Sequence, residues 1–101
     1  MIRDKVLSYI GLAMKSGNVV SGEFAVEKAV KSQKAHVVIV ANDASDNTKK
    51  KFYDMCSFYE VPVVSYAAKE ELGHAIGKEF RASIAVTDQG FAEALLKQLD
   101  K

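Results

Sequence analysis

The chain has 101 residues, 49% of them hydrophobic and 27% charged, which predicts one folded domain spanning residues 1–101. Its single cysteine, Cys56, excludes a disulfide framework and favours a reducing, cytoplasmic setting. No apolar run reaches the roughly 18 residues of a membrane span, so we expect no membrane partner. The net charge of +1 hides an asymmetry. Residues 1–51 carry nine basic and five acidic side chains, whereas residues 52–101 carry five and eight, so a basic face remains possible.

The spacing of apolar residues predicts helices that alternate with short strands. Gly17 and Gly77 mark helix ends, and Ser45 and Asp88 are placed to cap helix starts. In chain order, the predicted elements are a helix at 2–15 (with Ile2 on its inner stripe), a strand at 19–20, a helix at 21–34, a strand at 36–41, a helix at 46–59, a strand at 61–66, a helix at 68–76, a strand at 83–87 and a helix at 89–99. This alternation predicts an α/β fold, a three-layer α/β/α sandwich around a small mixed four-stranded sheet.

The helix predicted at Ser21–Lys34 has an unusual outer face. At 100° per residue, Phe24, Lys28 and Lys31 fall opposite the apolar side. A helix start offers unpaired backbone N–H groups, so together with two cations and a stacking ring it would suit RNA. A second interpretation is a solvated lysine face with Phe24 folded back as a hydrophobic staple. The run of lysines at 49–51 is open to the same two interpretations, solvation or phosphate contact.

A second basic and aromatic segment follows the helix at 68–76. Gly73 and Gly77 lie one helical turn apart, so we expect another backbone to approach closely there. The next residues, 78–81, form a charged loop that contains Phe80. We hypothesise that this loop and the start of the helix at 21–34 flank one RNA groove. The loop would press Ile76 or Phe80 against an unstacked base, and exchanging the two outer-face lysines for Glu would abolish binding.

Other chemistries lack their motifs. The glycines before Lys78 have the wrong spacing for a phosphate loop, and no dinucleotide motif is present. His36 and His74 have no partner at metal-ligand spacing, and Cys56 lies in an apolar stripe as an inert thiol would. Asp43 and Asp88 each follow a buried strand. We expect either that they meet at one edge of the sheet or that they serve separately, in a turn and as a helix cap. We therefore expect no enzyme, cofactor or metal.

Several stretches carry a family resemblance. They are VVSGE at 19–23, EKAV at 27–30, VVIVANDAS at 37–45, MCSFYEVPV at 55–63, LGHAIGKE at 72–79 and AVTDQGFA at 85–92. Together they resemble the ribosomal-protein family that binds kink-turn RNA, of the archaeal and eukaryotic large-subunit type, and most of all a small bacterial branch of it. The resemblance implies the α/β/α sandwich and RNA binding without catalysis.

In that family a helix start with the pattern Gly-x-Asn-Glu-x-x-Lys reads sheared G·A pairs, and the loop after the fourth helix covers an extruded nucleotide. Gly22 and Lys28 fit the pattern, whereas Phe24 and Ala25 stand where it has Asn and Glu. The expected roles are amide donors (Gly22, Glu23), a stacking ring (Phe24), phosphate-binding cations (Lys15, Lys28, Lys31) and a flap over the flipped base (Ile76, Gly77, Lys78, Glu79, Phe80, Arg81).

The leading prediction is thus a cytoplasmic, ribosome-associated protein, expected to be a monomer, that binds a structured RNA with a kink-turn-like or bulged stem. One alternative is a protein–protein adaptor in ribosome assembly that no longer reads RNA sequence. The outward Phe24, the alanine after it and the near-neutral total charge favour this alternative. A second is a small nucleotide-binding or hydrolytic domain, which would need a pocket of convergent polar groups.

Overall fold

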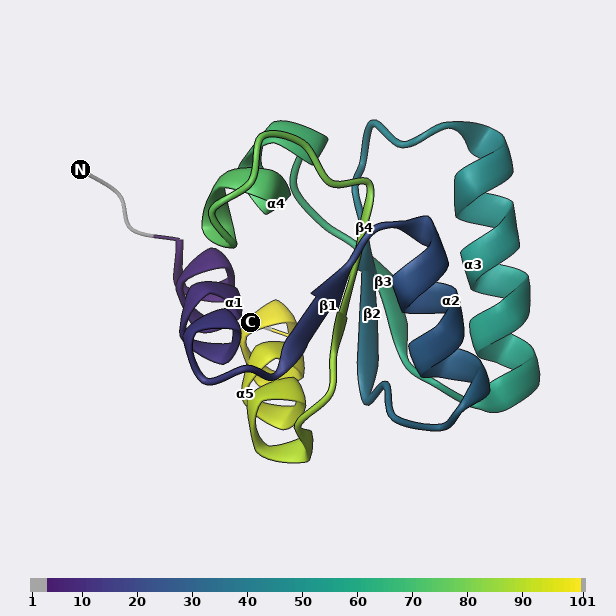
Figure 1. The fold of residues 1–101 in the computed structure, drawn as a ribbon, viewed down its shortest axis with the longest axis horizontal. Coiled ribbons are helices and arrows are strands. Elements are labelled where there is room, and N and C mark those ends of the chain that lie inside the picture. The colour runs from purple at the N-terminus through teal and green to yellow at the C-terminus, as the bar shows by residue number, and fades with distance from the viewer. Residues whose placement is uncertain (1–3, 101) are drawn as a thin grey trace.

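The computed structural model describes residues 4–100. Its elements alternate as predicted, which confirms the α/β class (Figure 1). The helices are α1 (Lys5–Lys15), α2 (Glu23–Lys31), α3 (Asp46–Tyr59), α4 (Lys69–Ala75) and α5 (Gln89–Leu99), and the strands are β1 (Val19–Ser21), β2 (Val37–Val40), β3 (Val63–Ser65) and β4 (Ser83–Val86).

The four strands form one mixed sheet in the order β1-β4-β2-β3. β4 runs antiparallel to both of its neighbours, and β2 runs parallel to β3. The two central strands are buried along their whole length, because helices cover both faces of the sheet there. This explains why residues 37–40 are apolar without alternation. The edge strands β1 and β3 are only partly buried.

The helices make the outer layers of the predicted sandwich. α2 and α3 pack side by side on one face, and α1, α4 and α5 lie on the other (Figure 1). The apolar stripes of these helices meet the central strands, so Ile10, Val26 and Phe52 are completely buried. Ser45 and Asp88 cap helix starts as predicted, because each accepts a hydrogen bond from a backbone N–H group of the first turn. Asp4, which the prediction placed inside the first helix, caps α1 in the same way.

Three helix predictions were too long, and one of them, at 68–76, exceeds α4 by only one residue at each end. The first helix begins at Lys5, and Ile2, assigned to its stripe, lies outside the described residues. The second was predicted at 21–34 but covers Glu23–Lys31. Ser21 instead pairs with Ile84 in the sheet, and the backbone turns left-handed at both ends, with φ of 92° at Gly22 and 60° at Gln33. Left-handed residues cannot continue a right-handed helix.

The suggested meeting of Asp43 and Asp88 was wrong. The strands before them, β2 and β4, are antiparallel, so the two residues follow opposite ends of the sheet. Asp43 Oδ1 accepts the Lys69 amide at 2.8 Å, and Asp88 Oδ2 accepts the Phe91 amide at 2.9 Å. Asp88 therefore serves as the cap that was predicted, whereas Asp43 binds the first amide of α4, which lies 26 positions further along the chain.

Candidate nucleic-acid interface

The start of α2 is built by Gly22. Its φ of 92° and ψ of 154° lie in a region that essentially only glycine adopts, and this sharp turn takes the chain from β1 into the helix. The Gly22 amide donates to the Ser83 carbonyl at 3.1 Å, so it is not the open donor that the sequence suggested. Because glycine has no capping side chain, the N–H groups of Glu23, Phe24 and Ala25 have no acceptor among the described residues.

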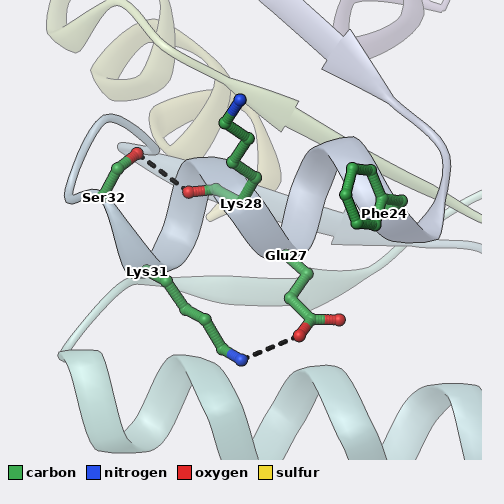
Figure 2. A pocket seen from close by; sticks show the side chains of 5 residues that line it. All are labelled: Phe24, Glu27, Lys28, Lys31 and Ser32. Carbon is green, nitrogen blue, oxygen red and sulfur yellow. Dashed lines mark hydrogen bonds and ion pairs between the residues drawn. The ribbon is translucent and has the colours of Figure 1, made fainter.

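Phe24 points outward beside those amides. Its side chain is 82% exposed, so the staple interpretation is wrong and the ring is available for stacking. It lines a surface pocket of about 390 Å³ on the outer side of α2, together with Glu27, Lys28, Lys31 and Ser32 (Figure 2). The helical spacing thus predicted both sides of α2 correctly, since Val26, Ala29 and Val30 are buried against the sheet.

The two lysines of this face differ in their partners. Lys31 Nζ lies 2.8 Å from Glu27 Oε2, whereas Lys28 extends away from that carboxylate and has no ion pair among residues 4–100 (Figure 2). Lys51 of α3 reaches across to the same carboxylate at 2.7 Å and to Glu23 at 3.4 Å. Lys51 is therefore not a freely solvated member of the lysine run at 49–51.

These ion pairs shift the pKa values of their members. Hydrogen bonds from Lys31 and then from Lys51 lower the pKa of Glu27 from 4.5 to about 2. The same carboxylate raises the pKa of both lysines. Glu27 is thus ionised at neutral pH and partly neutralises two of the nearby cations. Sequence spacing alone reveals the Glu27–Lys31 pair, which is i, i+4, but Lys51 joins it only through the packing of α3 on α2.

The loop after α4 has a well-defined geometry. Gly77 has a φ of 76°, its amide donates to the His74 carbonyl, and the Lys78 amide donates to the Gly73 carbonyl, which together form a Schellman motif. The returning chain then crosses Gly73, where an added Cβ would lie 2.6 Å from the Glu79 carbonyl oxygen. The predicted close backbone approach is confirmed at Gly73.

Arg81 joins this loop to the start of α2. Its Nε donates to Ser21 Oγ at 3.0 Å, and its Nη1 donates to the Phe80 carbonyl oxygen at 2.6 Å. Ser21 directly precedes Gly22, so two segments that are 60 positions apart in the sequence lie side by side. Phe80 is 53% exposed on the loop. Two exposed aromatic rings and a set of unpaired amides thus belong to adjoining segments of the surface.

Not every predicted site residue joins this surface. Ile76 is only 5% exposed and belongs to the core, so it cannot press on a base. Lys15 is the last residue of α1. It lies before the first residue of β1, whereas Gly22 follows the last residue of that strand (Figure 1). Lys78 and Glu79 are exposed on the loop. Sequence analysis missed Ser21, whose role depends on a contact with Arg81 that no local pattern signals.

Metal binding, a reactive thiol and a membrane-spanning helix were also considered from the sequence. Within the described part of the chain, no three His, Cys, Asp or Glu side chains gather where they could hold a metal ion. Cys56 is buried, and its burial raises the pKa of the thiol to about 11. Among residues 4–100, no helix has both the length and the apolar character needed to cross a membrane.

The fold and the matching stretches of sequence define the family of this protein. The chain belongs to the Ribosomal protein L7Ae/L30e/S12e/Gadd45 family, whose sequence profile matches residues 4–96. It is 46% identical over 91 residues to the RNA-binding protein YlxQ of Bacillus subtilis (strain 168), a match that covers 90% of this chain and 91% of that protein. The resemblance to this family, including its small bacterial branch, is confirmed.

Solved structures agree in fold. A protein with unknown function from Bacillus halodurans C superposes with a TM-score of 0.95 at 39% identity, over 98% of this chain and all of that one. The 15.5kD RNA binding protein of Giardia lamblia has a TM-score of 0.81 at 19% identity, over 99% of this chain and 92% of that one. The second likeness concerns the fold alone.

Proposed function

We propose that this chain is a ribosome-associated RNA-binding protein that recognises a kinked or bulged stem, and that its activity is binding without catalysis. The observation that carries the proposal is the Arg81–Ser21 hydrogen bond, which fixes the loop at 77–81 beside the start of α2. Family membership and the name of the Bacillus subtilis relative support RNA as the ligand.

Each part of the proposed surface has a role. The unpaired amides of Glu23, Phe24 and Ala25 donate to phosphate or base acceptors at the positive end of the helix. The exposed rings of Phe24 and Phe80 stack on unpaired bases, an interaction worth about 1–3 kcal/mol per base. Lys28 contacts a phosphate. Three groups predicted from the sequence are not assigned to this surface because of their positions, namely Lys15, Ile76 and the Gly22 amide.

This chain lacks two of the side chains that read bases in the family pattern. Phe24 and Ala25 occupy the positions of Asn and Glu, so stacking replaces two polar side chains at the helix start. We therefore expect a preference for a bent or bulged stem over a plain duplex, with a smaller contribution from the identity of its G·A pairs. A gel-shift comparison of a kink-turn stem, the same stem with its G·A pairs replaced and a plain duplex tests this order.

Lys28→Glu should weaken RNA binding by about tenfold or more and reduce the salt dependence, because a phosphate contact is lost. Lys31→Glu should have a smaller effect, since Lys31 is already paired with Glu27. Lys97→Glu, an equal charge change on the exposed surface of α5 across the sheet, is the control. Affinities measured at several salt concentrations check this. Equal losses in all three variants, or binding that does not respond to salt, would contradict the proposal.

A further inference from the structure

β1 is an edge strand whose outward backbone groups can be identified from its pairing. The Thr87 amide donates to the Asn18 carbonyl, and the Gly22 amide donates to the Ser83 carbonyl. In an antiparallel ladder the hydrogen-bonded pairs recur every second residue, so Val20 faces β4 with its N–H and C=O. Val19 and Ser21 therefore direct theirs away from β4. No strand lies on that side within residues 4–100.

A pocket of about 200 Å³ adjoins this edge, between β1 and α2. Its apolar lining comes from Val20, Ala25 and Ala29, and Lys28 and Lys34 supply its charge. The other lining residues are Ser32 and Thr87, so the pocket contains no carboxylate. We call the outer edge of β1 together with this pocket the edge groove. Lys28 extends from α2 on the side away from Glu27, which leaves its charge unopposed (Figure 2).

We propose that the edge groove binds an extended, acidic segment of a partner protein, which adds to the sheet as a fifth strand beside β1. Such a segment pairs its backbone with Val19 and Ser21. A residue opposite Val20 then places its side chain on the same face as Val20, in the pocket, because facing residues of paired strands project to the same side. Carboxylates two positions before and after that residue project from the same face and meet Lys28 and Lys34. The edge groove shares Lys28 with the proposed RNA surface, so Lys34, which that surface does not include, is the residue that distinguishes the two interactions.

The chemistry of the edge favours a peptide over the other occupants. Val19 and Ser21 each offer a donor and an acceptor, and a peptide backbone supplies both complements. RNA phosphates only accept, so they would leave the carbonyl groups without partners. A second copy of this chain, paired edge to edge, would bring two cationic rims together without compensating carboxylates in the pocket.

The test is a titration of isotope-labelled protein with the blocked heptapeptide Thr-Glu-Thr-Val-Thr-Glu-Thr, in which the valine and both glutamates project from the same face of the strand. We expect saturable changes in the amide resonances of Val19 and Ser21, and of Ala25 and Ala29 at the pocket. Two matched peptides serve as controls, one with lysine in place of glutamate and one with serine in place of valine. The proposal is overturned if the first peptide leaves these amides unchanged at millimolar concentration, or if either control binds as tightly.

Two variants distinguish the contribution of the lysine charge to peptide binding from that of the β1 backbone. Lys34→Glu should weaken the peptide by about three- to tenfold, whereas Lys97→Glu should not. Val19→Pro removes an outward N–H without touching the ladder to β4, and it should weaken the peptide while thermal unfolding remains cooperative. If this variant does not fold, the Lys34 result decides.

Two further outcomes would also overturn the proposal. If Lys34→Glu weakens the kink-turn stem as much as the peptide, the groove belongs to the RNA surface. If sedimentation reveals a dimer that Lys34→Glu changes, a second copy occupies the groove. Loss of peptide binding with RNA binding intact separates this inference from the proposed function.

Discussion

At the scale of single residues, Gly73 allows the loop at 77–81 to pack closely against α4. The backbone of Glu79 and Phe80 crosses Gly73 so closely that an added Cβ would lie 2.6–2.8 Å from three of its atoms. Those atoms belong to the main chain and cannot move aside as a flexible side chain would. A side chain at this position must therefore displace the loop, although alanine favours the helix itself more than glycine does.

Gly73→Ala should lower the free energy of unfolding by about 1–3 kcal/mol, the usual cost of overpacking, and weaken RNA binding because Phe80 and Arg81 move with the loop. Gly90→Ala in α5 is the matched control, since its nearest atom, an Asp88 side-chain oxygen at 3.2 Å, need move by only a few tenths of an ångström. Chemical denaturation and gel shifts measure the two effects. If Gly73→Ala keeps both stability and affinity, the loop is not held by this contact.

At the scale of elements, Glu27 connects two helices. It accepts from Lys31 within α2 and from Lys51 on α3, and Glu23 adds a longer contact to Lys51. The carboxylate keeps α2 against α3 while reducing the positive charge beside Phe24. The cations on and beside the outer face of α2 are thus divided: Lys31 and Lys51 are paired with carboxylates, and Lys28 is left to act on a ligand.

Glu27→Gln should remove a pH-dependent part of the stability. A carboxyl whose pKa falls from 4.5 to about 2 on folding stabilises the protein fully above pH 4.5, and that contribution is lost as the pH falls to 2. The difference in unfolding free energy between wild type and variant should therefore shrink across this window. Glu93→Gln on α5, a carboxylate with no ion pair within the described residues, is the control. An unchanged difference between pH 5 and 2 would contradict the assignment.

The same Glu27→Gln variant should bind RNA more tightly and with a steeper salt dependence, because Lys31 and Lys51 become available to phosphates. Salt titration of the gel shift measures the slope. Glu93→Gln should leave both the slope and the affinity near those of wild type. A variant with unchanged affinity would mean that the RNA does not reach this part of α2.

At the scale of the whole molecule, one hydrogen bond joins the chain's beginning to the region after β3. Tyr66 donates its hydroxyl to Asp4 Oδ2 at 2.6 Å across 62 residues of sequence. Asp4 Oδ1 simultaneously accepts the Leu7 amide and caps α1. The carboxylate, followed by partial burial, raises the pKa of Tyr66 from 10 to about 12.

Tyr66→Phe should cost about 1.5–3 kcal/mol near neutral pH, through the lost hydrogen bond to a charged acceptor. A phenol whose pKa is higher in the folded state stabilises the protein fully below pH 10, and this contribution is lost as the pH rises through 12. The stability difference between wild type and variant should therefore narrow from pH 10 upward. Tyr53→Phe, which removes an exposed hydroxyl contact to Ser65, is the control. Parallel stability curves for wild type and Tyr66→Phe would contradict the assignment.

The sequence by itself determined the order and type of the elements, because each carries its own periodicity, cap or terminating glycine. It also determined the outward position of Phe24 and Lys28, which follows from helical spacing. Tertiary structure decided how the site is assembled. The Arg81–Ser21 contact, the pairing of Lys51 with Glu27 and the burial of Ile76 in the core all depend on residues far apart in the chain. Local patterns extend over one or two turns, whereas these contacts exist only after the sheet has brought distant segments together.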